Sequence, residues 1–546
     1  MSTRDTEAGD ALARSFLNGS IDRRTFLRRG AKLGGVAAGS GLLAALVQAC
    51  GGTSAKGLDT GGAPATKATA GGTLKAALTG EPDSLDPAKS QIYTGAQVYD
   101  NVFSKLIDID ERQRIYGVLA TKWTQRDAKT WVFDLREGVT FHNGEPFTAT
   151  DVRYTFERIQ DPKTASGYAP LYEVIDRIQV NSPTRVTFHL KTAFGPFLTN
   201  LANNGEIVSK MAIEAKDSAR KPVGTGPFAF VEWVQGDHLT LRRYPKYFES
   251  GKPHLDEITF RFAQVDQGRL DSLRSGELDW IDAVPLQQIA VVSKDPTFTY
   301  LTSRLAGIPD FLSFNLNKPP FDNKALRQAI AHAIDKTQIR QVAYFGAGED
   351  GAQEVPTGSP WYTPGDPYAK PDLAKAKAKL QESGHGGGLS FEYLGLPQYP
   401  ELLKTGEVLR DQLKKIGITM SIKQVDVSVW FDRFSKGDYE ATSAYQERTI
   451  DPDNFYSLVL KSGASINASG YSSKAADALI TQAARETDMA RRRAIYLQLR
   501  RLIWEDVPIA FVHYETLNYL MRKAVSGSTI NPTLELRMGD VSMEKS

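Results

Sequence analysis

The residues whose types suit chemistry gather in one short segment, Ser443 to Phe455, with the sequence SAYQERTIDPDNF. Within it, Asp451 and Asp453 occupy the first and third positions of a candidate calcium loop. Such a loop needs glycine at position six and a bidentate glutamate at position twelve, where this chain has Tyr456 and Ser462. We therefore expect no metal here and interpret the two aspartates as a turn that caps a helix starting near the last residue of the segment.

Catalytic motifs are incomplete along the rest of the chain. The run HGGG, His385 to Gly388, matches the oxyanion-hole motif of some esterases, but that chemistry also needs a G-x-S-x-G turn to expose a nucleophile, and the sequence has none. The seven histidines are never spaced i, i+4 and form no H-E-x-x-H motif of a zinc hydrolase. We interpret HGGG as a glycine-rich turn, and we expect no catalytic residues and no cofactor.

The overall composition indicates a large folded protein without a polyanion partner. The chain has 546 residues, 41% of them hydrophobic, which is enough for several domains. Its formal net charge is only +2, so no electrostatic drive toward nucleic acid exists. A single cysteine excludes a disulfide framework and any multi-cysteine metal site.

The N-terminal residues have the pattern of an export signal. A twin arginine, Arg23-Arg24, precedes a short apolar run from Leu33 to Ala49, which is typical of a signal peptide. The run ends in LVQAC, which resembles a bacterial lipobox, so we expect residues 1–49 to be removed and Cys50 to carry a lipid. The alternative is a plain signal peptide with an incidental cysteine. Residues 50–71, rich in Gly, Ala and Thr, would form a flexible tether to the membrane.

These functional segments must be positioned by a body that mixes strands and helices. Alternating apolar residues predict strands in TWVFDLREG (130–138), RVTFHL (185–190) and LSFEYLGL (389–396). TATDVRYTFERI (148–159) opens with a capping box and continues as a helix. A further helix stops at Gly417 and a strand follows, which is α/β organisation.

Several segments together resemble one family, the extracellular solute-binding proteins of peptide/nickel-type ABC importers (family 5, similar to dipeptide- and oligopeptide-binding proteins). Residues 119–159 carry its pattern of a tryptophan, an aromatic strand, Leu-Arg-x-Gly, Phe-His-x-Gly and Thr-Ala-x-Asp-Val. The other matching segments are GEPDSLDP (80–87), VGTGPFAFVEW (223–233), NKPPFDNKALRQAIAHAIDK (317–336), LKKIGI (413–418) and DPDNF (451–455). They follow one another in family order over nearly all of the chain beyond residue 72.

The resemblance implies a two-lobed α/β clamp of the periplasmic-binding-protein type, in the large class with an additional domain. By resemblance, residues 72–105, 222–308 and 506–546 form the first lobe, 106–221 the inserted domain and 309–505 the second lobe. It also implies a monomer on the outer face of the cytoplasmic membrane that passes a small solute or peptide to permease subunits.

For the binding site, the resemblance points to the segment from Ser443 to Phe455. In dipeptide-binding relatives an aspartate shortly before DPDNF holds the amino group of the ligand, and here that position falls on Arg448. An arginine prefers an anion, so the simplest dipeptide assignment is weakened, although Glu447 could meet an amine if the loop shifts by one residue. Tyr445 matches an aromatic wall of the relatives. The alternative for Glu447 and Arg448 is a solvated surface pair.

Three more residues complete the predicted binding set: Asp310 and Phe311, where the chain crosses between the lobes, and Glu81 on the first lobe, for which an exposed loop acid is an equally good account. We expect a non-enzymatic receptor of an ABC importer that binds a peptide or peptide-like solute. A carbohydrate or other polar or anionic solute comes second, a nickel chelate third, and a secreted hydrolase is the rival class.

Overall fold

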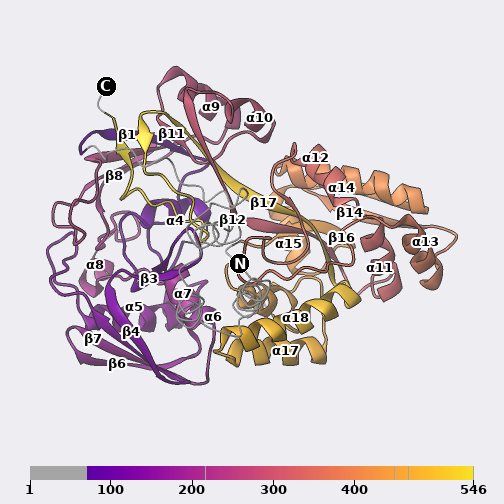
Figure 1. Cartoon of the computed structure of the whole chain (residues 1–546), viewed down its shortest axis with the longest axis horizontal. Coiled ribbons are helices and arrows are strands. Elements are labelled where there is room, and N and C mark those ends of the chain that lie inside the picture. The colour runs from indigo at the N-terminus through magenta and orange to yellow at the C-terminus, as the bar shows by residue number, and fades with distance from the viewer. Residues whose placement is uncertain (1–69, 91, 216, 448, 465, 545–546) are drawn as a thin grey trace, which may run out of the picture. The chain divides into compact units, whose positions relative to one another are not determined.

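The computed structural model describes residues 70–544 except 91, 216, 448 and 465. Within these residues, a sheet of eleven strands is the largest element, and helices flank it as the α/β prediction requires (Figure 1). In spatial order its strands are β15 (Ile418–Gln424), β14 (Leu389–Gly395), β16 (Ala441–Tyr445), β12 (Phe298–Phe314), β17 (Ile509–Arg522), β11 (Trp280–Ile281), β1 (Thr73–Leu78), β10 (Glu257–Phe262), β9 (His238–Arg243) and β8 (Phe228–Val234), with β13 (Glu349–Asp350) paired to β17 beside this row.

The long strands β12 and β17 join the two ends of this sheet. They pair antiparallel from Phe298 opposite Arg522 to Ser313 opposite Ile509, with a register shift between Ser303 and Gly307. Figure 1 shows them running from β1 and β11 on one side to β14 and β16 on the other. Both halves of the sheet therefore contain part of this one antiparallel pair, β12 with β17, which we call the ribbon.

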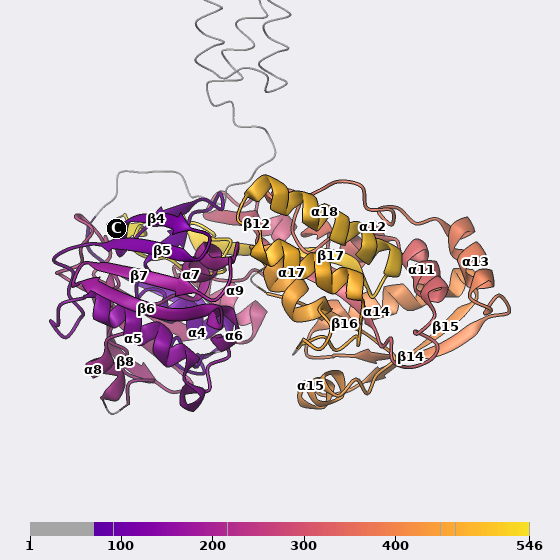
Figure 2. The ribbon, with the colours of Figure 1, turned by 90° about the horizontal axis from the view of Figure 1, so that it is seen from below.

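A second sheet has the strand order β4 (Ala120–Asp127), β5 (Thr130–Leu135), β7 (Arg185–Leu190) and β6 (Ile175–Ser182). Its strands β5 and β7 confirm the two strands predicted from alternation. Helix α5 (Ala149–Gln160) packs on it, and the predicted capping box is confirmed. The Thr148 N–H donates to Asp151 Oδ2 at 2.8 Å, and the Thr150 N–H donates to Thr148 Oγ1 at 3.2 Å. Figure 2 shows the four strands edge to edge.

The remaining helices surround both sheets. They are α4 (Tyr93–Tyr99), α6 (Ala169–Tyr172), α7 (Phe197–Asn204), α8 (Lys210–Glu214), α9 (Asp266–Ser275), α10 (Ile289–Val292), α11 (Lys324–Ala333), α12 (Lys336–Ala343), α13 (Leu373–Glu382), α14 (Pro400–Leu413), α15 (Val427–Ser435), α16 (Pro452–Phe455), α17 (Lys474–Arg485) and α18 (Met489–Asp506). The shorter strands are β2 (Ile107–Ile109), β3 (Ile115–Gly117), β18 (Val525–Ser526) and β19 (Ser542–Met543). Among residues 70–544, with the four gaps above, no helix has the length and apolar character needed to cross a bilayer.

The α/β unit predicted around Gly417 is present and positions the candidate site. Strand β14 leads into α14, Gly417 ends the helical region in the left-handed conformation (φ 89°), and β15 returns parallel to β14. Strand β16 also runs parallel to β14. Because parallel strands end at the same edge of a sheet, the loops after β14, β15 and β16 gather in one place, where α/β proteins commonly bind ligands.

Buried apolar side chains form separate clusters on the different parts of the fold. One cluster covers β1, β10, β9 and the residues after β18, another fills the space between the four-stranded sheet, α5 and α7, and two more lie around β14, α14, α16 and α18. The boundaries of the two lobes and the inserted domain remain a prediction.

Candidate functional site

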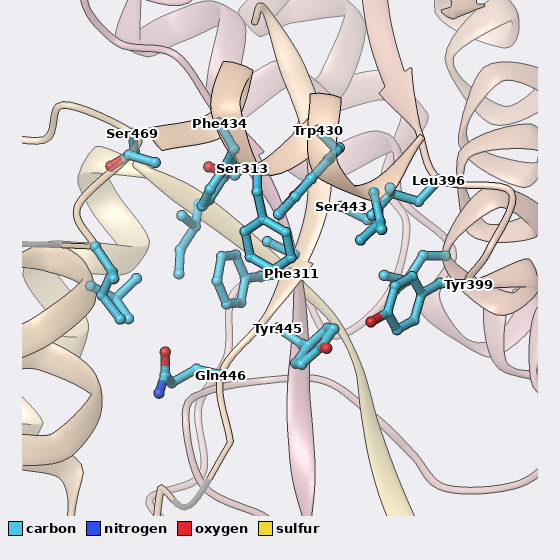
Figure 3. A pocket seen from close by; sticks show the side chains of 18 residues that line it. Phe311, Ser313, Leu396, Tyr399, Trp430, Phe434, Ser443, Tyr445, Gln446 and Ser469 are labelled. Atoms are coloured by element: carbon cyan, nitrogen blue, oxygen red, sulfur yellow. The ribbon is translucent and has the colours of Figure 1, made fainter. Parts of the chain in front are cut away.

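A cavity of about 190 Å³ opens at the shared edge of β14 and β16 (Figure 3). It is lined by aromatic, aliphatic and small polar side chains: Phe311, Ser313, Leu396, Tyr399, Leu402, Val427, Trp430, Phe431, Phe434, Ser443, Ala444, Tyr445, Gln446, Val459, Ile466, Ala468, Ser469 and Ile509. We call it the aromatic pocket. Its lining, as the described residues form it, carries no charged side chain.

Helix α15 supplies one wall of the aromatic pocket. The Trp430 and Phe434 rings stack with centroids 4.5 Å apart and an interplanar angle of 12°, as the i, i+4 spacing on a helix allows. Trp430 Nε1 donates to Thr442 Oγ1 on β16 at 2.8 Å, which fixes the helix to the sheet. Phe431, next in sequence, lies at the mouth with 58% of its surface exposed.

Most polar groups of this lining are already hydrogen-bonded within the protein. The Ser313 and Tyr439 hydroxyl groups bond at 2.9 Å, and Ser469 Oγ donates to Asn467 Oδ1 at 2.9 Å. Gln446 Nε2 donates to the carbonyl oxygen of the next residue at 3.2 Å. The pocket therefore presents mainly apolar surface to an entering group.

Two of the residues predicted to bind ligand line this pocket. Tyr445 ends β16, and its ring lies 6.1 Å from that of Tyr399, next to Phe311 in Figure 3. Phe311 of β12 makes edge contacts with Phe455 and Phe511, at 5.7 Å and 6.2 Å between centroids. The structure thus brings both residues into one cavity, and their role in binding remains a prediction.

The predicted Asp310 lies beside Tyr445 but is not part of the lining of the aromatic pocket. It is directly opposite Tyr445 in the β12–β16 register, and Phe311 points the opposite way because side chains alternate along a strand. Asp310 is 1% exposed, and its carboxylate accepts a hydrogen bond from the Tyr344 hydroxyl at 2.8 Å. The Tyr344 ring stacks on His513, with centroids 3.7 Å apart.

Further carboxylates interact with Asp310, and together Asp310, Glu401, Glu447 and Glu515 form what we call the acidic face. Burial, then the charges of Glu401 and Glu447, raise the pKa of Glu515 on β17 to about 8. Burial, then Glu515, raise the pKa of Asp310 well above its usual value, although the Tyr344 hydrogen bond opposes this. These effects keep protons on the acidic face at neutral pH, and a cation placed there would displace them.

Sequence reasoning missed Glu401 and Glu515. Glu515 interrupts the apolar strand IAFVHYETL, and Glu401 follows a proline at the first turn of α14. An acid inside an otherwise apolar strand was an available signal for the first. Nothing local distinguished the second from an ordinary acid in the first turn of a helix.

The turn at Asp451 to Phe455 is confirmed, with one correction. Asp451 caps α16, accepting from the Asp453 N–H at 2.9 Å, so the helix begins at Pro452 rather than near Phe455. Both oxygens of Asp451 also accept from the Arg492 guanidinium, at 2.5 Å and 2.6 Å. An arginine therefore occupies the carboxylate that a calcium loop would have used.

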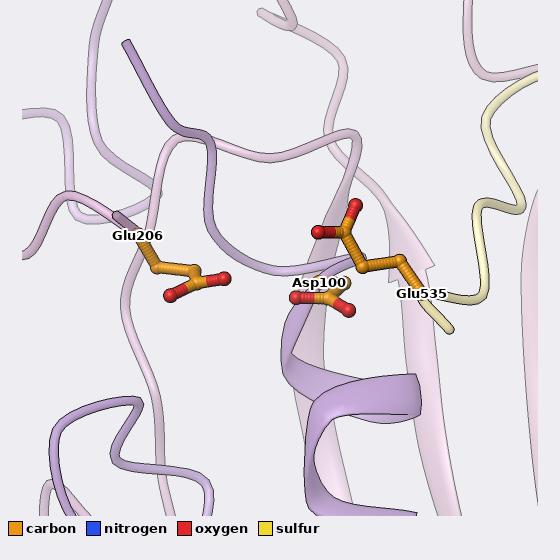
Figure 4. A group of neighbouring side chains, drawn as sticks. All are labelled: Asp100, Glu206 and Glu535. Carbon is orange, nitrogen blue, oxygen red and sulfur yellow. The ribbon is translucent and has the colours of Figure 1, made fainter. Parts of the chain in front are cut away.

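A separate acidic group lies near the C-terminal segment. Carboxylate oxygens of Asp100, Glu206 and Glu535 all lie within 4.8 Å of one another (Figure 4). Glu535, however, pairs with Lys105 and, at 2.9 Å, with Arg537. Burial alone would lower the pKa of the Lys105 ammonium, but the surrounding carboxylates raise it overall. The group is an ion network around a buried lysine, and we assign no metal to it.

A profile of the family described as bacterial extracellular solute-binding proteins, family 5, matches residues 114–467 of the chain. The chain belongs to this family. The match includes the predicted binding residues Asp310, Phe311, Tyr445 and Glu447 and the whole of α15.

Curated relatives and solved structures agree with this membership. Glutathione-binding protein GsiB of Pectobacterium atrosepticum is 26% identical over 465 residues, 82% of this chain and 90% of that protein. The ABC transporter-associated periplasmic binding protein DppA from Helicobacter pylori, in complex with the peptide STSA, superimposes with a TM-score of 0.76 and 27% identity, covering 87% of this chain and 99% of that one. The periplasmic binding protein AgaA from A. tumefaciens R10, in complex with agropinic acid, gives 0.76 and 28% over 87% and 99%.

Membership confirms the main predictions made from the sequence. This family 5 protein has the two-lobed α/β fold of periplasmic binding proteins. It is an exported solute-binding receptor of an ABC importer, which works with membrane permease subunits. The family is one of binding proteins rather than of enzymes.

Five of the predicted site residues lie apart from the aromatic pocket or outside the described residues, and two of these, Asp310 and Glu447, belong to the acidic face. Glu81 accepts from Trp233 Nε1 at 2.8 Å and from the Gly236 N–H at 3.2 Å, so its carboxylate already has partners next to β8. Arg448 and the predicted lipid-bearing Cys50 lie outside the residues that the structure describes. A role in binding or anchoring remains a prediction for every one of the predicted site residues of this family 5 protein.

Proposed function

We propose that this receptor captures a peptide or peptide-like solute, holds its protonated amino group against the acidic face, and delivers it to the permease without chemical change. The observation that carries the proposal is the acidic face itself. Carboxylates that raise one another's pKa lower their energy when a cation binds among them. A permanently anionic solute would gain no such stabilisation.

The amine-binding role deepens an expectation that the sequence left open. Arg448 stands where dipeptide-binding relatives carry an aspartate, but Asp310 and Glu515 supply carboxylates from two neighbouring strands instead. Glu447 acts on the same region, because burial, then the charges of Glu401 and Glu447, raise the pKa of Glu515. Similarity to a glutathione-binding protein and to a structure holding a peptide supports a peptide-like ligand.

The test combines a change in the protein with a change in the ligand. Calorimetry with short peptides should show binding to the wild type, and Glu515→Gln should weaken it at least tenfold. N-terminal acetylation, which removes the amine charge, should weaken binding to the wild type by a similar factor and have little further effect in the variant. Glu137→Gln, on an exposed loop, is the matched control and should bind as the wild type.

Two results would overturn the proposal. One is equal affinity of wild type and Glu515→Gln for the same amine-bearing peptide. The other is a protein whose melting temperature rises with an oligosaccharide or a nickel–histidine chelate but with no peptide, since a bound ligand stabilises the folded state by an amount that grows with the logarithm of its concentration relative to its Kd.

The proposed assembly is a monomer with the lobe boundaries given by the resemblance: residues 72–105, 222–308 and 506–546, then 106–221, then 309–505. The apolar clusters around β1 and around the four-stranded sheet support two of these parts, whereas Val507, Ala510 and Val512 pack in the cluster around β14 and α14. Closure of the lobes would enclose the ligand and create the shape that the permease recognises. We also propose that the protein has no enzymatic activity, because neither sequence nor pocket supplies a nucleophile and base together.

The proposed membrane anchor is a lipid on Cys50, after export through the twin-arginine signal. Cys50→Ser should move the protein from the membrane fraction to the soluble fraction, because one lipidated residue is the whole anchor. Ser54→Ala in the same tether should stay with the membrane. Equal membrane association of the Cys50→Ser protein would overturn the anchor.

A further inference from the structure

We infer that the ligand inserts an uncharged apolar side group, an aromatic ring or a branched aliphatic chain, into the aromatic pocket. This inference rests on the proposed function and adds the side-chain class that the receptor selects. It is carried by the size of the cavity, the chemistry of its lining and the exposed apolar residues at its mouth.

The cavity is large enough to hold one six-membered aromatic ring. It measures about 190 Å³, and a dry apolar cavity of roughly 150 Å³ is enough to hold benzene. The stacked Trp430 and Phe434 rings, with Phe311 opposite, offer faces and edges to an aromatic group. Aromatic pairs of this kind contribute beyond the area that they bury.

The lining also rejects charge. A charged group that enters loses its water and finds no opposite charge among the described lining residues. Ser313, Ser469 and Gln446 are already hydrogen-bonded within the protein. The buried Ser443 hydroxyl has no partner in the part of the chain that the structure describes, but a single neutral hydroxyl does not replace the water around a charge. An apolar group enters without that desolvation cost.

The mouth of the pocket shows where the ligand would cover the protein. Phe431 and Ile466, both part of the lining, are 58% and 41% exposed. Val429, on the same helix, is 44% exposed but lies outside the lining. It therefore serves as a matched control for truncation of an exposed apolar side chain on α15.

The acidic face lies next to this pocket through Tyr445. Tyr445 lines the aromatic pocket, and it is directly opposite Asp310 in the sheet. Burial, then Tyr399 and the carboxylates of Glu447 and Glu515, raise the pKa of the Tyr445 hydroxyl. A peptide whose amino group lies on the acidic face would therefore place the side chain of its first or second residue in the aromatic pocket.

The experiment is calorimetry with tripeptides that differ only in the first or second side chain, which is Phe, Leu, Lys or Glu. At one of the two positions, the wild type should bind Phe or Leu at least tenfold more tightly than Lys or Glu. Phe431→Ala should reduce that preference about fivefold or more, and Val429→Ala should leave it unchanged. Gln446→Glu, which places a carboxylate in the lining, should raise the affinity for Lys relative to Phe.

The outcomes separate the two proposals. The inference is overturned if Phe, Leu, Lys and Glu bind with equal affinity at both positions of the peptide. It is also overturned if Phe431→Ala leaves the preference for Phe and Leu unchanged. In either case the proposal of a peptide receptor is unaffected. Failure of every peptide in the series to bind overturns the proposed function itself.

Discussion

Asp451 and Asp453 show how one neighbour decides the behaviour of two similar carboxylates. The two terminal nitrogens of Arg492, Nη1 and Nη2, donate to the two carboxylate oxygens of Asp451. Asp453, two residues on, accepts only from the Ser457 hydroxyl, at 2.8 Å, among the hydrogen bonds of its side chain in the described structure. Burial, then the charge of Asp451, raise the pKa of Asp453 to about 6.

This pKa predicts a pH dependence of stability with a definite sign. A carboxyl group whose pKa is higher in the folded than in the unfolded protein takes up a proton on folding. Its contribution is therefore favourable at low pH and is lost as pH rises from about 4 through about 6. Asp453→Asn cannot ionise, so from pH 4 to pH 7 its stability should rise relative to the wild type by roughly 3 kcal/mol.

Urea unfolding at the two pH values measures this difference. Asp432→Asn, an exposed acid on α15, should show almost no trend. A constant difference between wild type and Asp453→Asn across the pH range would contradict the assignment of the raised pKa.

At the scale of elements, the buried Arg492 connects α18 to the N-terminal cap of α16. Arg492 reaches from α18 to the cap of α16 and lies over the Trp361 ring, with its guanidinium carbon 5.0 Å from the ring centroid. Its neighbour Arg491 faces solvent and pairs with Glu486 at 2.8 Å. One helix thus offers a buried and an exposed ion pair at adjacent positions.

We predict that these two pairs differ greatly in their effect on stability. Arg492→Leu leaves Asp451 buried without its cation and should cost about 3–5 kcal/mol of unfolding free energy. Arg491→Leu breaks only a solvent-exposed pair and should change the unfolding free energy far less. Denaturant unfolding of both variants checks the prediction, and similar costs for the two would refute it.

At the scale of the whole molecule, β12 and β17 connect the two halves of the large sheet, and the ribbon is irregular where the acidic face begins. The register shifts between Ser303 and Gly307. A Cβ atom on Gly307 would lie 1.8 Å from the carbonyl oxygen of Glu515 and 2.8 Å from the Tyr514 ring. Glycine is required here by this close approach of two strands rather than by its φ angle.

Gly307→Ala should therefore force the strands apart, costing at least about 1–3 kcal/mol of stability. Because the backbone displaced is that of Glu515, the same variant should weaken binding of an amine-bearing peptide. Thermal unfolding and calorimetry measure the two effects. Gly387→Ala is the control, since a Cβ there meets nothing within 4 Å. Wild-type stability in Gly307→Ala would show that the ribbon adapts at no cost.

The sequence by itself determined the local structure and the family. The capping box at Thr148, the helix end at Gly417 and the cap at Asp451 depend on interactions between residues only a few positions apart, so their patterns are readable in order along the chain. The resemblance of ordered segments also identified the receptor fold. Tyr445 and Phe311 were predicted from that resemblance, and the structure places both in one cavity.

Only the tertiary structure decided the chemistry of the site. Asp310 and Glu515 are more than two hundred positions apart and meet because β12 and β17 pair in one register. The neutrality of the aromatic pocket is likewise a property of eighteen side chains gathered from several segments. Charge interaction and desolvation depend on distance in space and on burial, and neither is written in the spacing of residues along the chain.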